Sequence, residues 1–228
     1  MNYAMNYSMV KRLILKDWFF MRWAILAYFA TGLLALGLTA MGSEASSYAG
    51  SILLITVMIA IGFHLVMVTV VAERSEQTLP FIMSLPISPM EYTMAKIGAN
   101  LLIFLIPWLT LTSATQLLLG TEGARSGALI PFSLIILTEL LAAYLLVLTV
   151  AIVTESLGWT ICVLVITNLF FQGFLYWVSH LPAIARGMKG RGAVWDQTAV
   201  TLLAVEVGVS ILLIVMAFVL QRRKRDFL

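Results

Sequence analysis

The chain has 228 residues, of which 61% are hydrophobic and only 11% are charged, and its mean hydropathy is +1.01. Soluble domains carry about 25% charged residues, so this composition excludes an ordinary water-soluble protein. The net charge of +3 is small, and four basic residues at 222–225 adjoin an apolar segment. That placement is typical of a cytoplasmic anchor of a membrane span and not of a nucleic-acid-binding surface.

The first segment with a clear pattern covers residues 5–17. Its apolar side chains fall on one arc of a helix and its basic side chains on the other, which predicts an interfacial helix among the lipid headgroups. Asp17 interrupts the apolar arc, and we expect it either to pair with Lys16, Arg22 or a neighbouring loop, or to be a solvated acid at a helix start. The two arcs consist of Met9, Val10, Leu13 and Ile14, and of Lys11, Arg12 and Lys16.

Six apolar segments then follow, each close to or above the roughly 20 residues that cross the hydrocarbon core of a bilayer. The sequence therefore predicts an all-α membrane protein with a single transmembrane domain of six helices over residues 1–228. The expected spans are 23–41, 51–71, 97–119, 129–151, 158–178 and 200–220.

The distribution of basic residues predicts how these spans are oriented. Six spans place both termini on one side of the membrane, and ten of the fourteen Lys and Arg residues fall on that side. Cytoplasmic loops carry the excess of basic residues. We therefore expect a multi-pass protein of the cell (inner) membrane with both termini in the cytoplasm.

The loop between the second and third spans, residues 73–96, carries clear helix signals. Ser88-Pro89-Met90-Glu91 predicts a helix start in which Ser88 accepts from the amide of Glu91 and the Glu91 side chain reaches back. Upstream, Thr78 can cap a short helix that ends at Pro86. Three apolar residues fall on one face of that short helix, namely Leu79, Ile82 and Met83.

The pattern in this loop resembles the first cytoplasmic loop of ABC transporter permeases of the ABC-2 type. It comprises Glu73-Arg74, Thr78-Leu79, Ser84 to Ser88 and Lys96. The resemblance implies the type 2 ABC exporter fold, with an N-terminal elbow helix and a cytoplasmic coupling helix that docks on a separate ATPase subunit. An amphipathic loop lying on the headgroups is the alternative. The implied docking residues are Glu73, Arg74, Thr78, Leu79, Ile82, Met83, Leu85 and Pro86.

Motifs for catalysis are missing from the sequence. There is no GxxxxGK[ST] phosphate loop, so any ATP and Mg²⁺ would be bound by a partner subunit, and we expect no cofactor in this chain. His64 and His180 lie at opposite depths, which argues against an intramembrane enzyme. The single cysteine, Cys162, excludes an intramolecular disulfide and a cysteine-rich metal site. We predict neither catalytic residues nor a metal site.

Two acids lie alone in the outer halves of their spans, Glu139 in the fourth and Glu206 in the sixth. A charge near the bilayer centre costs about 3 kcal/mol or more. Each acid is therefore either a protonated or hydrogen-bonded group that joins helices, which we favour, or a site for a cationic substrate. They could also face each other or a basic residue of the 179–198 loop.

The fifth span carries Asn168 and Gln172 one turn apart, with Phe171 beside them. In the family that the loop resembles, the second and fifth spans line the central cavity of the dimer, and the 179–198 position holds short outer helices. The resemblance therefore makes His64, Asn168, Phe171 and Gln172 candidates for substrate contact. An interhelical hydrogen-bond pair at Asn168 and Gln172 explains the same residues without a substrate.

Together with the hydropathy, the resemblance implies that the chain is the permease subunit of an ATP-driven exporter. The resemblance implies two ATPase subunits and a second permease, identical or different, as partners in the lipid bilayer. The alternative is a non-transporting membrane protein whose loop recruits a cytoplasmic regulatory partner, and a less favoured one is an intramembrane enzyme. The sequence does not specify the substrate.

Single-cysteine labelling tests this topology. After Cys162 is replaced, Ser75→Cys and Arg222→Cys should react with a membrane-impermeant thiol reagent only from the cytoplasmic side, because both positions lie next to basic residues that remain inside. Labelling of either position from the outside would contradict the orientation.

Overall fold

The computed structural model describes residues 7–75, 88–121, 124–190 and 192–223. Every secondary-structure element in these ranges is a helix. The order is α1 (Tyr7–Ala40), α2 (Glu44–Val66), η1 (Met67–Val71), α3 (Ala72–Ser75), α5 (Pro89–Thr121), α6 (Ala124–Gly127), α7 (Ile130–Thr154), α8 (Leu157–His180), α9 (Pro182–Met188) and α10 (Gln197–Arg223).

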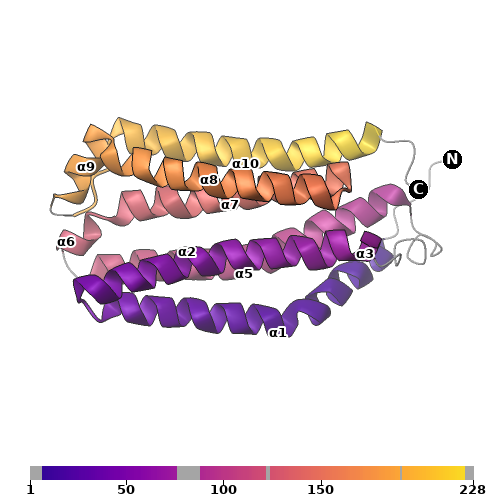
Figure 1. Ribbon diagram of the computed structural model, residues 1–228, viewed down its shortest axis with the longest axis horizontal. Coiled ribbons are helices and arrows are strands. Elements are labelled where there is room, and N and C mark those ends of the chain that lie inside the picture. The colour runs from indigo at the N-terminus through magenta and orange to yellow at the C-terminus, as the bar shows by residue number, and fades with distance from the viewer. Residues whose placement is uncertain (1–6, 76–87, 122–123, 191, 224–228) are drawn as a thin grey trace.

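Within the described ranges, six helices are long and apolar enough to cross a membrane. They are α1, α2 with its π-helical extension η1, α5, α7, α8 and α10. The all-helical class and the six spanning helices predicted from the sequence are thereby confirmed. Each helix is longer than the expected span, although α1 ends one residue before the end of its expected span and α7 begins one residue after the start of its own. The start of α1, the end of α10 and α3 lie at the same end of the molecule (Figure 1).

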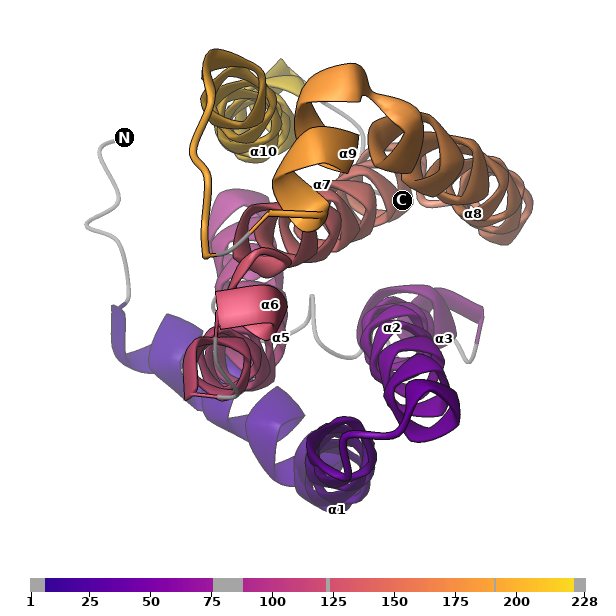
Figure 2. The same ribbon diagram turned by 90° about the vertical axis from the view of Figure 1, so that its left-hand side faces the viewer.

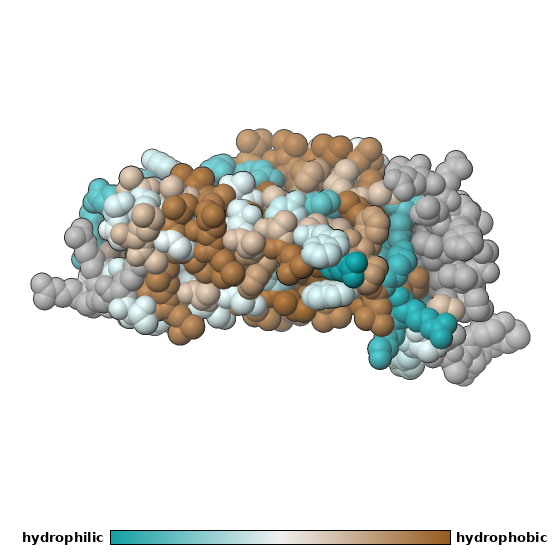
Figure 3. Space-filling model, turned by 90° about the horizontal axis from the view of Figure 1, so that it is seen from below, coloured by the Kyte–Doolittle hydropathy of each residue, from teal (hydrophilic) through white to brown (hydrophobic). Residues whose placement is uncertain are grey.

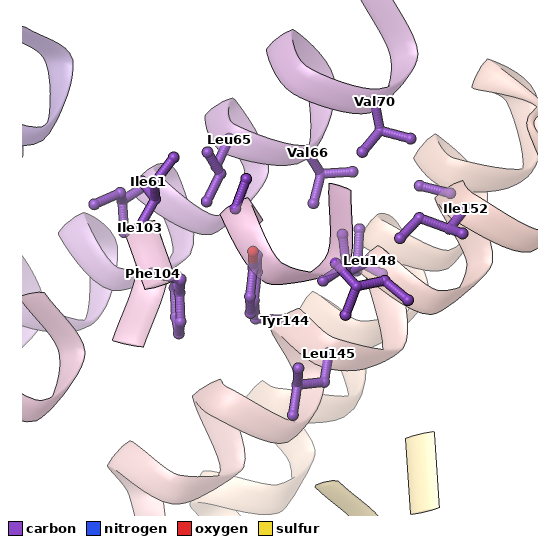
Figure 4. Close-up of a cluster of buried hydrophobic side chains, with 14 of the residues drawn as sticks. Ile61, Leu65, Val66, Val70, Ile103, Phe104, Tyr144, Leu145, Leu148 and Ile152 are labelled. Atoms are coloured by element: carbon purple, nitrogen blue, oxygen red, sulfur yellow. The ribbon is translucent and has the colours of Figure 1, made fainter. Parts of the chain in front are cut away.

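The fourth spanning helix, α7, is the centre of the bundle (Figure 2). It packs against α10 and α8 on one side and against α5 and α2 on the other. The core is built where α2, α5 and α7 meet, and Figure 4 shows its side chains. The rings of Phe104 and Tyr144 stack there with centroids 3.9 Å apart. Helix α7 therefore joins the two halves of the bundle.

The hairpin of α1 and α2 depends on a glycine at a close approach. A Cβ atom at Gly50 would lie 2.6 Å from the carbonyl oxygen of Ala35 and 2.4 Å from Oγ1 of Thr39. Only glycine lets the two backbones come this near. Ser43 caps the start of α2 by accepting a hydrogen bond from the amide of Ser46 at 3.1 Å.

From Tyr7 on, the segment expected to form an interfacial helix over 5–17 belongs to α1, which continues without a break from Tyr7 to Ala40. Figure 1 shows that α1 bends, so that its first part runs toward the start of α5. Leu13 is buried against Tyr92 and Ala95 of α5. The basic residues of the first turns, Lys11 and Arg12, are exposed. The assignment of this part of α1 as an elbow helix stays a prediction.

The surface carries the pattern of a membrane protein. On the face seen in Figure 3, hydrophobic residues fill the middle of the molecule and hydrophilic residues gather toward its ends. Large apolar side chains such as Trp23, Leu117 and Leu169 are about 70% exposed. Exposed apolar surface of this extent is unfavourable in water, so it fits a chain surrounded by lipid.

Candidate functional site

Four charged side chains meet at the end of the molecule where α3 begins the 73–96 loop. Nζ of Lys96, on α5, lies 2.7 Å from Oδ2 of Asp17 on α1 and 2.8 Å from Oε1 of Glu73 on α3. Lys16 pairs with the same two carboxylates. This four-residue cluster, which we call the charge cluster, joins three helix segments that are far apart in sequence.

Burial makes the charge cluster unusual. The side chains of Lys96 and Asp17 are 2% and 4% exposed, that of Glu73 is 11% exposed, and only Lys16 remains half exposed. Two cations face two anions, so the cluster is neutral as a whole. Burial disfavours the ionised form of Glu73, but attraction to Lys96 and the hydrogen bonds from both lysines outweigh it, and the pKa of Glu73 lies below its ordinary value of 4.5.

A hydrogen-bonded polar chain continues from the charge cluster into the bundle. The hydroxyl of Tyr92 donates to Oε2 of Glu73 at 2.9 Å. One turn beyond Lys96, the side-chain amide of Asn100 donates to the carbonyl of Lys96 and to Oγ1 of Thr69 in the π-helix η1. Tyr144 of α7 donates to the carbonyl of Asn100 at 3.1 Å. The polar chain thus links the end of the loop to the central helix.

The end of the loop at 88 is fixed by the capping box that the sequence predicted. The amide of Glu91 donates to Oγ of Ser88 at 3.2 Å, and the amide of Ser88 donates back to Oε2 of Glu91 at 2.7 Å. This prediction is confirmed. Because Lys96 lies less than two turns further along α5, the cap and the charge cluster together fix where α5 begins.

Most of the predicted docking residues lie outside the described residues. These are Thr78, Leu79, Ile82, Met83, Leu85 and Pro86, so the coupling helix stays a prediction. Glu73 is described and belongs to the charge cluster. Arg74 lies in α3, and its side chain is outside what is described.

A groove between α2, α7 and α8 contains two of the candidate substrate residues. Asn168 and Phe171 line it together with Gly62 and Tyr144, and its walls are otherwise mostly apolar. Asn168 donates to the carbonyl of Leu164 within α8 at 2.9 Å. The groove carries no charged side chain among its lining residues.

The other two candidate substrate residues lie apart from this groove. Gln172 is exposed on the outside of α8 and does not line it. Nδ1 of His64 lies 3.0 Å from the hydroxyl of Tyr28, so His64 connects α2 with α1. The four residues expected to contact substrate are therefore not all gathered on one surface of this chain.

The two isolated acids lie on helices that pack against each other, α7 and α10. Glu206 is only 5% exposed, and within the described part of the chain neither of its carboxyl oxygens has a hydrogen-bond partner. Glu139 is half-buried. The described residues contain no group of three or more His, Cys, Asp or Glu side chains that could hold a metal ion.

Sequence reasoning found part of the charge cluster. The pairing of Asp17 with Lys16 was one of its alternatives and is confirmed, whereas Arg22 instead stacks over the ring of Phe19. The main partner of Asp17 is Lys96, which is 79 residues away. A signal for this pair existed, since both residues lie at the ends of apolar segments, where an unpaired charge would be buried.

Comparisons of the chain with protein-family models, with curated proteins and with solved structures found no match.

Removing the buried cation should destabilise the fold far more than removing the exposed one. Lys96→Met removes the buried cation from both Asp17 and Glu73, and we expect a loss of about 3–5 kcal/mol in the free energy of unfolding. Lys16→Met is the matched control and should lose about 0–1 kcal/mol. Unfolding in mixed micelles measures both. Equal losses for the two variants would show that burial of Lys96 does not matter.

Proposed function

We propose that this chain is the membrane subunit of an ATP-driven exporter, and that it works as a dimer with two separate ATPase subunits. In this proposal the 73–96 loop receives movement from the ATPases and transmits it to the spanning helices. The bundle then rocks between inward-facing and outward-facing or collapsed states and moves substrate outward. ATP and Mg²⁺ are bound by the ATPase, and this chain only transmits the movement.

The observation that carries the proposal is the charge cluster. Both ends of the 73–96 loop are attached to it, through Glu73 at one end and Lys96 at the other, and Asp17 attaches the approach to the first span. A loop that transmits force must be rigidly attached to the helices at both of its ends, because a flexible attachment would absorb the movement. A loop that only lies on the headgroups has no need of a buried, fully paired attachment.

Further support comes from the polar chain behind the charge cluster. It connects the third span with η1 and with the central helix through Asn100, Thr69 and Tyr144. Short π-helical segments inside longer helices occur frequently at functional sites. Here the π-helix lies just before Glu73, where a movement of the loop would enter the second span.

The groove lined by Asn168 and Phe171 is the part of this chain best suited to contact substrate. The groove lies between the second span and the fifth. In the family that the loop resembles, the second and fifth spans line the central cavity of the dimer. In a dimer, the exposed residues of α8, among them Gln172, would complete the pathway together with the second subunit.

Charge substitutions in the loop test this proposal. Leu79→Asp with Ile82→Asp should reduce association with the ATPase by roughly tenfold or more, because the apolar face that fills its groove is lost. Ser84→Asp is the control, since it adds a charge off that face at helical spacing. Co-purification of the ATPase and substrate-stimulated hydrolysis are the two measurements.

Membrane insertion of the double variant and of the control should match the parent chain. If stimulated hydrolysis survives both apolar substitutions, the docking assignment is wrong. If the chain captures no ATPase at all but retains another cytoplasmic protein through the same loop, the exporter proposal fails and the loop recruits a regulatory partner instead.

A further inference from the structure

Buried polar oxygens without partners gather on one side of α10. Both carboxyl oxygens of Glu206 and the hydroxyl oxygen of Ser210 make no hydrogen bond within the described part of the chain. The two residues are 5% and 7% exposed and lie one helical turn apart. Buried polar groups in proteins are almost always hydrogen-bonded. The unpaired oxygens on this side of α10 therefore indicate that a hydrogen-bonding group or a proton belongs here.

The helix that packs against this side of α10 is α7, and two contacts define their register. Ile135 and Ala199 belong to one buried cluster near the outer ends of the two helices. Toward the other end, the hydroxyl of Thr149 donates to the carbonyl of Leu213 at 3.2 Å. The second contact lies fourteen residues beyond the first on both helices. The two helices are therefore parallel and keep a constant register between these two points.

This register brings Glu139 close to Glu206. Glu139 lies level with Leu203 on α10, so the two acids differ by three residues in height, about 4.5 Å along the helix axis. Two glutamate side chains are long enough to span that offset, so the two carboxyl groups can meet at the interface. An unpartnered buried acid and a half-buried one thus face the same helix interface.

The described residues of the helices around α10 offer no cation for this pair. On α7 the other titratable group is Tyr144, which bonds Asn100. On α9, Arg186 is exposed and bonds the carbonyl of Pro182. The titratable groups of α5 are at its opposite end and take part in the capping box and the charge cluster. They are Glu91, Tyr92 and Lys96.

We propose that Glu139 and Glu206 form a proton-binding site that holds one exchangeable proton between the two carboxyl groups. The proton sits on Glu206, which donates to the carboxylate of Glu139. Its loss to water leaves two facing negative charges in an apolar interface, an arrangement disfavoured both by burial and by repulsion. Release of the proton therefore weakens the packing of α10 against α7, and rebinding restores it.

A proton fits this site better than a divalent metal ion. The described part of the chain brings no third acidic, histidine or cysteine ligand to the two carboxyl groups, whereas Ca²⁺ takes six to eight oxygen ligands. Glu139 is only half-buried, so the proposal places the exit of the proton on the Glu139 side. The site depends only on the α7–α10 interface and does not require the exporter proposal to be correct.

Infrared spectroscopy of the purified full chain in lipid nanodiscs tests the site. The C=O stretch of a protonated carboxyl absorbs apart from carboxylate bands, and at neutral pH we expect this absorption from one carboxyl. It should disappear as the pH is raised, with a parallel fall in the melting temperature. Glu206→Gln should lose both the band and the pH-dependent fall, whereas Glu44→Gln, an exposed acid at the start of α2, should change neither.

Two outcomes would overturn the proposal. A protonated band that persists across the whole pH range would mean a permanently neutral structural acid. No band at neutral pH, with a melting temperature that rises in sodium chloride but not in choline chloride, would mean a sodium site. If Glu206→Gln does not fold, the titration of the unmodified chain decides, and a band without pH dependence contradicts the shared proton.

Discussion

The ammonium group of Lys96 is buried between two carboxylates, and the end of the bundle where α1 starts depends on that arrangement. A lysine with a 2% exposed side chain is tolerable only if its charge is compensated at hydrogen-bond distance. Asp17 and Glu73 provide this compensation from two other helix segments. The need to pair one buried charge therefore determines where α1, α3 and α5 lie relative to one another.

This constraint has a consequence for movement. A buried ion pair is either closed or fully separated, because a partly separated pair has lost much of its attraction while its charges are still shielded from water. Segments attached to such a cluster move together or not at all. A force applied between Glu73 and Lys96 would therefore displace the start of the first span as well, and the polar chain through Asn100 and Tyr144 would carry the displacement to α7. This is the property that a coupling loop requires.

The two polar centres of the molecule differ in kind. In the charge cluster two cations neutralise two anions, and every member has a partner. At the α7–α10 interface two acids meet with no cation from the described helices around them, so a proton must take its place. The first centre is suited to rigidity, and the second to a reversible change in the packing of α10 against α7.

The sequence was most informative where the signal is local. Hydropathy located all six spanning helices, and the spacing of Ser88 and Glu91 was enough to predict a capping box, because both depend on neighbouring residues. For the pairing of Asp17 with Lys96 the sequence held only an indirect signal, a charge at the end of each apolar segment, because the pairing itself depends on how α1 bends toward α5. The π-helix η1 and the register that brings Glu139 near Glu206 likewise arise from packing between helices.

A double-mutant cycle between Asp17 and Lys96 tests the central claim most directly. Asp17→Asn, Lys96→Met and the combined variant would be unfolded in mixed micelles alongside the parent chain. If the buried pair holds the helix ends together, the double variant should be less destabilised than the sum of the single variants, by about 1–3 kcal/mol. Losses that add within about 0.5 kcal/mol would contradict the pairing and the role given to it here.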